Sequence, residues 1–343
     1  MALSLIVNAG LMALPIGGCL GTLFGIDAHR AANGQRPLFA PNPNDPDENR
    51  GTGGSTGGGQ DSTGGGSGSS GGDVSDNGIQ TNPYCQLSYG ISPPSKDGET
   101  FTLNPNQWNV QKGSDKGALC MNVTTFNNMT YPTKYSAPDF SVTWQFDPGP
   151  ETDPVYAFPN IMVDKVLPVG LDDMQELYLN VHWTYGVGDE IATTTDESEL
   201  TANNVNTNVA IDMFFDSDKV TAQDSTSAKY EVMVWFGMFG PSTQPHGYPK
   251  IVTTNTINGT KFNLYSDKNA NTNQNVLTWV ATETVEEFNG DIYPLITDLY
   301  NMTGSVYPSS SDYLGYFGFG SEAFSADKNV TFGVTNLEIG IKT

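Results

Sequence analysis

Short runs of alternating hydrophobic and polar residues follow one another from residue 101 to the C-terminus, separated by Gly, Asn, Asp and Pro. A period of two is typical of strands that bury one face, because successive side chains of a strand point to opposite sides. Short strands divided by turn residues indicate an all-β fold, a two-sheet sandwich or jelly roll. The runs predict nine strands, at 101–103, 140–146, 176–185, 209–215, 230–236, 261–265, 276–281, 313–319 and 330–341.

One segment departs from this alternation and has the periodicity of a helix. Between residues 291 and 300, apolar residues stand at Ile292, Leu295, Ile296 and Leu299. This is the i, i+3, i+4, i+7 spacing that places side chains on one helical face. The pattern therefore predicts one short helix among the strands.

A strand near the middle of the chain carries a glutamate on the face opposite to its core residues. Alternation directs Val232 and Val234 into the core and Glu231, Met233 and Trp235 to the other side. A carboxylate beside an apolar contact and a flat aromatic ring suits a sugar-binding cleft. A lone glutamate on a strand is more often simply hydrated, so a second acidic residue is needed before chemistry is inferred.

That second acid lies in the alternating segment 316–324, which continues the strand predicted at 313–319. Alternation would place Tyr316, Gly318, Gly320 and Glu322 on one face, and the glycines would leave room for a close approach to the backbone. Two strands that each present a glutamate on an open face could supply an acid and a base.

Several segments resemble motifs of glycoside hydrolase family 12, and they occur in the family's order. Glu-Val-Met-Val-Trp at 231–235 resembles the nucleophile strand, and Gly-Ser-Glu-Ala-Phe at 320–324 resembles the acid/base segment. Asn-Val-Ala-Ile-Asp-Met-Phe at 208–214 and Pro-His-Gly at 245–247 are similar to a further strand and turn of the family. Asn-Gln-Trp-Asn at 106–109 is similar to its Asn-Leu-Trp-Gly motif, and the resemblance runs from about residue 85 to the C-terminus.

The resemblance implies a jelly roll with a concave substrate cleft, a helix on the convex side, and a retaining glycosidase mechanism. It assigns Glu231 as nucleophile, Glu322 as acid/base, and Asp212 as the acid that supports the nucleophile. In such enzymes the two catalytic carboxyl groups lie about 5 to 5.5 Å apart. Repulsion at that distance is expected to raise one pKa, which keeps the acid protonated while the nucleophile stays ionised.

The resemblance also implies substrate contacts. Trp108 would stack on a glucosyl ring, although a core tryptophan is the competing interpretation, and Met233 and Trp235 would form the cleft floor. Pro245 and Tyr316 are further candidates for substrate binding. A second tryptophan of the family is replaced by Ser88, so the non-reducing end of the cleft is expected to differ. His246 stands where the family has Ile, in the loop expected to cover the acceptor side.

The family's N-terminal disulfide has its counterpart in Cys85 and Cys120, which enclose a loop of 120 − 85 = 35 residues. A bridge there would stabilise the fold by about 3 to 4 kcal/mol on the loop-entropy model. Two free buried thiols are the alternative. The third cysteine, Cys19, lies in the hydrophobic N-terminal segment.

The N-terminal part divides the chain into three regions. Residues 1–26 are almost continuously apolar and read as a signal or signal-anchor segment; residues 27–81 are rich in Gly, Ser, Pro and Asn and read as a flexible linker; residues 82–343 form the catalytic domain. The basic residues follow the apolar segment, which by charge would retain the domain in the cytosol. Paired cysteines and five Asn-x-Ser/Thr sequons favour the secretory route instead, and the sequons begin at Asn122, Asn128, Asn258, Asn301 and Asn329.

Charge and histidine spacing argue against several classes of function. The net charge of -23 argues against nucleic acid as a partner, and the three histidines do not have the spacing of a metal site or a Ser-His-Asp triad. We therefore expect an extracellular, monomeric endo-β-1,4-glucanase without a cofactor or metal, acting on internal bonds of cellulose, mixed-linkage glucan or xyloglucan and tethered to a membrane if residues 2–26 are retained. A carbohydrate-binding or surface-recognition protein without turnover is the alternative.

Overall fold

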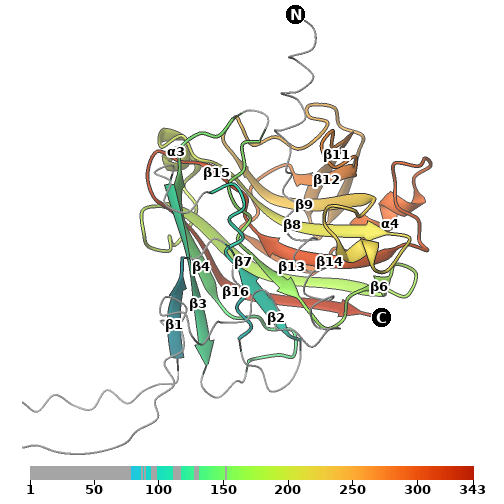
Figure 1. The fold of residues 1–343 in the computed structure, drawn as a ribbon, viewed down its shortest axis with the longest axis horizontal. Coiled ribbons are helices and arrows are strands. Elements are labelled where there is room, and N and C mark those ends of the chain that lie inside the picture. The colour runs from blue at the N-terminus through green and yellow to red at the C-terminus, as the bar shows by residue number, and fades with distance from the viewer. Residues whose placement is uncertain are drawn as a thin grey trace, which may run out of the picture.

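Two β-sheets packed face to face make up the folded chain (Figure 1). The computed structural model describes residues 79–85, 88, 90–93, 99–110, 117–126, 131–150 and 153–343. The smaller sheet has the strand order β1, β3, β4, β16, β7, β13. These strands are β1 (Ile79–Tyr84), β3 (Gly117–Phe126), β4 (Phe140–Phe146), β7 (Glu176–Val187), β13 (Glu287–Asp291) and β16 (Val330–Lys342).

The larger sheet carries Glu231 on one of its central strands. Its order is β10, β11, β12, β9, β8, β14, β5, β2, and two further strands, β15 and β6, pair with β8 and β14. Strands β9 and β12 run parallel to each other. The strands are β2 (Phe101–Asn104), β5 (Asn160–Val163), β6 (Val169–Gly170), β8 (Asn206–Asp216), β9 (Tyr230–Phe239), β10 (Thr253–Ile257), β11 (Thr260–Lys268), β12 (Asn275–Ala281), β14 (Tyr313–Gly320) and β15 (Ala323–Ser325).

All nine predicted strands form, and the two-sheet all-β prediction is confirmed. The pattern missed seven strands, namely β1, β3, β5, β6, β10, β13 and β15. Most of these are short, and the four residues of β5 are all buried, so they show no alternation. Strand β1 begins at Ile79, so residues 79–81 belong to a sheet and not to the predicted linker. The predictions for residues 1–78 lie outside the described residues.

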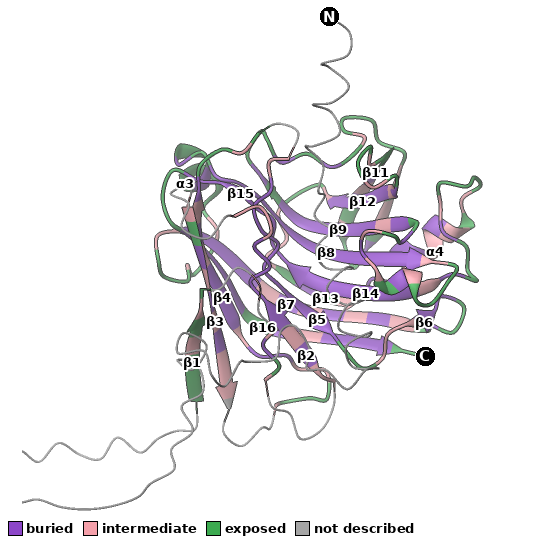
Figure 2. Cartoon of the chain, in the orientation of Figure 1, coloured by how far each residue is buried: buried purple, intermediate pink, exposed green. Residues whose placement is uncertain are grey.

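The main core lies between the sheets, where Figure 2 shows buried residues along the strands of both. Val232 and Val234 are fully buried in it, as the alternation predicts. Met233 and Trp235 belong to a separate cluster on the other face of β9. The larger sheet therefore buries apolar side chains on both faces, and its outward face is the one available to a ligand.

The predicted helix forms as α4 (Tyr293–Asn301), with Leu295, Ile296 and Leu299 buried. The indole of Trp279 donates a hydrogen bond to the backbone carbonyl of Leu295. Because Trp279 is in register with Val234, α4 packs on the core side of the larger sheet, as predicted. A second helix, the single turn α3 (Glu197–Ala202), was not predicted. In the described part of the chain no helix is long and apolar enough to cross a membrane.

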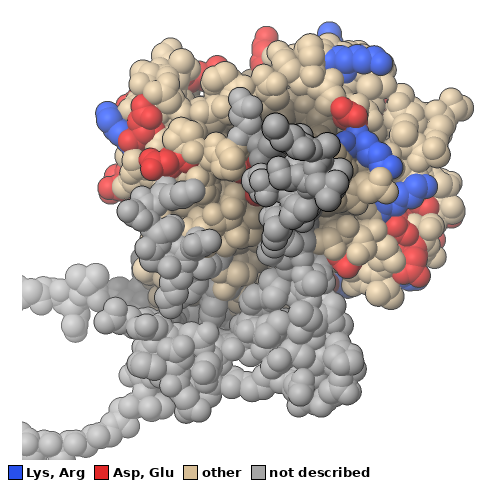
Figure 3. Space-filling view, turned by 45° about the horizontal axis from the view of Figure 1, so that its top comes forward, with Lys and Arg blue, Asp and Glu red and all other residues tan. Residues whose placement is uncertain are grey.

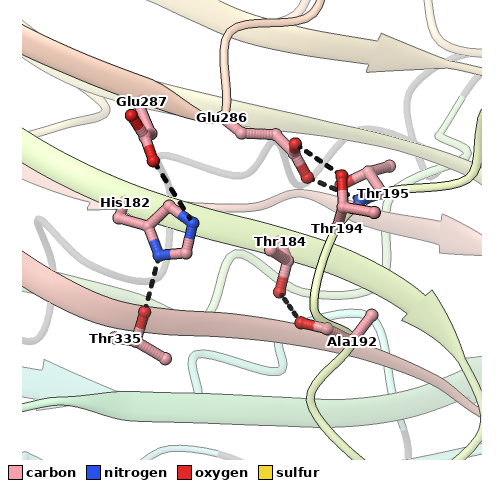
Figure 4. Close-up of polar contacts among 8 residues, drawn as sticks. All are labelled: His182, Thr184, Ala192, Thr194, Thr195, Glu286, Glu287 and Thr335. Carbon is pink, nitrogen blue, oxygen red and sulfur yellow. Dashed lines mark hydrogen bonds and ion pairs between the residues drawn. The ribbon is translucent and has the colours of Figure 1, made fainter.

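A loop between β7 and α3 is tied to the outer face of the smaller sheet (Figure 4). The carboxylate of Glu286 accepts hydrogen bonds from the hydroxyl of Thr194 and the backbone N–H of Thr195. Thr184 on β7 donates to the carbonyl of Ala192. These bonds hold the loop over one end of the smaller sheet.

Cys85 and Cys120 form a disulfide that joins the end of β1 to β3, as the resemblance implies. Of the sequon asparagines, Asn122 is partly buried on β3 and Asn258, Asn301 and Asn329 are exposed. The side-chain amides of Asn258 and Asn329 already donate hydrogen bonds to the Asn289 carbonyl and to Asp189. Asn128 lies outside the described residues.

Candidate active site

A cleft of about 310 Å³ opens on the outward face of the larger sheet, and Glu231 and Glu322 both line it. The two predicted glutamates therefore meet, although 322 − 231 = 91 residues separate them. Strands supply the floor of the cleft and loops supply its walls. The other lining residues are Asp153, Pro154, Val155, Met233, Trp235, Ser242, Gln244, Pro245, His246, Asn269, Asn271, Thr272, Gln274, Thr278 and Phe324.

Strand β8 lies between the strands that carry the two glutamates. On one side it pairs with β9, where Phe214 is opposite Glu231 and Asp212 is opposite Met233. On its other side it pairs with β14 and β15, and Glu322 lies in the two-residue link between them. Glu322 is thus just beyond the end of a strand, not within one as the alternation implied.

Asn208 on β8 holds Glu322 at two points. Its side-chain oxygen accepts the backbone N–H of Glu322 at 2.9 Å, and its amide nitrogen donates to the carboxylate oxygen Oε2. The first bond fixes the orientation of the amide, because the acceptor end faces a donor. Asn208 is fully buried. The motif at 208–214 includes this residue, but its hydrogen bonds to Glu322 could not be inferred from the sequence.

Glu231 differs from Glu322 in accessibility and in hydrogen bonding. Its side chain is partly accessible from the cleft, whereas Glu322 is 7 % exposed. Within the described part of the chain no hydrogen bond restrains its carboxylate. Both line the cleft, and Glu231 is the more accessible of the two.

Burial raises the pKa of both glutamates. It raises the pKa of Glu231 to about 8, with repulsion from Glu322 as a second cause. It raises the pKa of Glu322 to about 7, against the hydrogen bond from Asn208, which lowers it. The expectation that repulsion raises only one of the pair is wrong, because desolvation acts on both. The hydrogen bonds, and not the pKa values of the free site, distinguish the two groups.

Asp212 is the third acid of the site and is almost fully buried. Burial raises its pKa well above the ordinary value, and the charges of Glu231 and Glu322 raise it further. No group of the described residues hydrogen-bonds its oxygen Oδ1, which is itself buried. Three acids with raised pKa values thus lie close enough to interact.

The floor beside Glu231 is apolar and aromatic. Met233 and Trp235 pack with Phe158 and Tyr265, and the partly buried Trp108 packs against this cluster. Trp108 is packed on the cleft face and is not among the residues that line the cavity, and its stacking on a sugar ring stays a prediction. Among the described residues, no partner binds the buried indole N–H groups of Trp108 and Trp235.

The candidates around Tyr316 are placed differently from the prediction. Tyr316 is on the expected face, but it is buried against Phe214 and does not line the cavity. A Cβ at Gly318 would lie 2.6 Å from the Tyr316 hydroxyl, and one at Gly320 would lie 2.1 Å from the Pro159 carbonyl. These glycines therefore accommodate other parts of the protein and not a ligand.

Loops contribute much of the cleft wall, which the sequence did not reveal. The β9–β10 connection supplies Pro245, Gln244 and His246, and the β11–β12 hairpin supplies Asn271 and Gln274. None of the described lining residues is Lys or Arg. On the face drawn in Figure 3, basic side chains are interspersed with acidic ones. The cleft thus offers hydroxyl, amide and carboxyl groups to an uncharged ligand.

Three comparisons with known proteins agree with this geometry. The family model described as glycosyl hydrolase family 12 matches residues 99–342. A xyloglucan-specific endo-beta-1,4-glucanase A of Aspergillus niger is 32% identical over 143 residues, which cover 42% of this chain and 49% of that protein. An inactive glycoside hydrolase of Phytophthora nicotianae is 33% identical over 135 residues, which cover 39% of this chain and 52% of that protein. The chain thus spans about half the length of these relatives.

Among solved structures, the fold is similar to that of the endoglucanase 3 of Trichoderma harzianum. The TM-score is 0.59 and the identity 23%, over 78% of this chain and 100% of that one. At this identity the likeness shows the shared jelly-roll fold.

Proposed function

The chain belongs to glycosyl hydrolase family 12, and from this premise we propose that it is a retaining endo-β-1,4-glucanase. The observation that carries the proposal is the convergence of Glu231 and Glu322 in one cleft. Both are largely withdrawn from water, and their pKa values are raised. A site that holds a proton between two carboxyl groups near neutral pH suits acid/base work on a glycosidic bond.

In the first step, Glu322 protonates the glycosidic oxygen while a carboxylate oxygen of Glu231 attacks the anomeric carbon. The bond to the leaving sugar breaks, and a glycosyl-enzyme ester forms at Glu231. In the second step, Glu322 takes a proton from water, the water oxygen attacks the same carbon, and the ester bond breaks. The accessibility of Glu231 from the cleft and its freedom from hydrogen bonds within the described chain support its role as nucleophile.

The hydrogen bond from Asn208 is compatible with an acid role for Glu322. The amide donates to Oε2, and in a protonated carboxyl group the carbonyl oxygen is the better acceptor, so Oε2 suits that part. We therefore assign the proton to Oε1 and its transfer to the substrate to that oxygen. Asp212 is buried close enough to both glutamates for their charges to raise its pKa. We assign it the role of supporting Glu231.

We propose an unbranched or branched β-1,4-glucan as substrate, with xyloglucan as the first to test. The names of curated relatives, such as the Aspergillus niger enzyme, support xyloglucan. The apolar floor formed by Met233, Trp235 and the adjacent Trp108 suits the apolar faces of glucosyl rings. The disulfide supports an extracellular location, because such bridges persist in oxidising compartments.

A binding protein without turnover is the second candidate, since one relative is named an inactive glycoside hydrolase. The presence of both glutamates in the cleft favours the enzyme, because recognition alone does not require an acid pair.

Reducing-sugar release by the full chain from xyloglucan and carboxymethylcellulose tests the proposal. We expect hydrolysis by the wild type, and a loss of roughly 10²-fold or more in Glu231→Gln and Glu322→Gln, the scale of acid/base catalysis. Glu322→Gln should still bind oligosaccharide.

Glu287→Gln is the matched control, because Glu287 is exposed on the outer side of β13 beside His182 (Figure 4). It should hydrolyse both polymers at the wild-type rate. Binding of oligosaccharide by a wild type that releases no sugar from either polymer would instead support the second candidate.

A further inference from the structure

A chain of buried polar side chains runs from the smaller sheet to the backbone of Glu322. We call it the hydroxyl network, and it consists of Trp144, Tyr185, Thr207 and Ser321. All four residues are at most 1 % exposed. They come from β4, β7, β8 and the β14–β15 link, so tertiary structure alone brings them together.

The contacts are continuous. The indole N–H of Trp144 donates to the Tyr185 hydroxyl at 2.5 Å. That hydroxyl lies 3.1 Å from the Ser321 hydroxyl and 3.2 Å from that of Thr207, and the last two are 2.9 Å apart. Thr207 donates to the carbonyl of Glu322 at 2.6 Å.

One arrangement of protons satisfies every donor in this network. An indole N–H can only donate, so the Tyr185 oxygen accepts from Trp144 and its own proton is free for Ser321. Ser321 can then donate to Thr207, and Thr207 to the Glu322 carbonyl. Burial raises the pKa of Tyr185 to about 12, so it stays a donor.

The network and Asn208 hold the same residue from opposite faces of the larger sheet. Thr207 and Asn208 are neighbours on β8, and strand alternation directs their side chains to opposite sides. Thr207 binds the backbone carbonyl of Glu322 from the core side, and Asn208 binds its N–H and carboxylate on the cleft side. Glu322 lies outside the strand ladder, so these side chains replace ladder bonds as its support.

A polar network is a costly element between two hydrophobic sheets, because each buried group left without a partner costs about 1 to 3 kcal/mol. Apolar side chains would fill the same space without this risk. We propose that Trp144, Tyr185, Thr207 and Ser321 are positioning residues that fix Glu322 for proton transfer to the glycosidic oxygen. The inference rests on the proposed function.

Two substrates that differ in their leaving group distinguish a loss of acid catalysis from a general loss of structure. An unsubstituted β-glucan needs a proton on the departing oxygen, whereas dinitrophenolate departs from dinitrophenyl β-cellobioside without one. Values of kcat/KM report the first, bond-breaking stage with both substrates. We would measure them for Thr207→Val and Tyr185→Phe, which remove hydroxyls, and for Thr207→Ser, which retains one.

We expect Thr207→Val and Tyr185→Phe to lower kcat/KM on the glucan by about tenfold or more, the cost of a misplaced catalytic group. Their values on the aryl glycoside should stay within about twofold. Thr207→Ser should restore the glucan activity. Thr331→Val is the matched control, because Thr331 is 1 % exposed and donates to the Gly188 carbonyl on the smaller sheet. It should change neither value.

Equal losses on both substrates, or no loss on either, would overturn the inference and leave the proposed function standing. If Thr207→Val does not fold, Tyr185→Phe and Ser321→Ala make the same comparison. A wild type inactive on both substrates would overturn the proposed function and this inference with it.

Discussion

A single amide, that of Asn208, binds both the backbone N–H and the carboxylate of Glu322. Its hydrogen bond lowers the pKa of Glu322 against the effect of burial. Asn208→Ala should therefore raise that pKa and move the basic limb of the pH profile of kcat/KM to higher pH. The rate at the optimum should fall, because the carboxyl group loses its anchor.

Asn180→Ala is a chemically matched control, since Asn180 donates to the carboxylate of Glu338 on the smaller sheet. It should leave the pH profile unchanged. A profile that stays in place in Asn208→Ala would mean that Asn208 does not set the pKa of the acid.

Strand β1 is one of the two end strands of the smaller sheet. Among the described strands it pairs with β3 alone, and the disulfide from Cys85 to Cys120 joins the same two elements. Replacing both cysteines by serine should lower the free energy of unfolding by about 3 kcal/mol on the loop-entropy model. Thermal denaturation measures this.

Hydrogen exchange locates the effect of that replacement. Protection should fall most in β1 and β3 and least in β8 and β9, which lie in the other sheet. Activity at 25 °C should be retained for the same reason. Equal loss of protection in β9 would show that the bridge supports the whole sandwich.

For the molecule as a whole, the buried acids make stability depend on pH. The pKa of Glu322 is raised from 4.5 to about 7, so the folded chain keeps a proton that the unfolded chain loses. This contribution to stability is complete below pH 4.5 and is lost as the pH rises through 7. It amounts to roughly 3 kcal/mol.

The midpoint of thermal unfolding should accordingly fall between pH 5 and pH 8, and it should fall less in Glu322→Gln, whose side chain does not ionise. Glu287 is exposed on β13, so the unfolding midpoint of Glu287→Gln should fall as much as that of the wild type. A wild type equally stable at both pH values would contradict the raised pKa.

Local patterns in the sequence were enough for much of the fold and for selecting Glu231 and Glu322, the two glutamates that line one cleft. The alternation around Glu231 separated its core side from its cleft side because the strand period is a property of the backbone. The helical spacing at Leu295 and Leu299 located α4 for the same reason. Strands such as β5, buried on both sides, carry no such alternation and were missed.

The surroundings of the acids were decided by tertiary structure. Strand β8 brings Asn208 and Thr207 to Glu322, and β7 brings Tyr185 to its neighbour Ser321, across more than a hundred residues of sequence. Loop residues such as His246 line the cleft for the same reason. A sequence pattern indicates to which face of its strand or helix a side chain points. Which groups desolvate, anchor and orient a buried carboxyl depends on the packing of elements against one another, and that appears only in the folded chain.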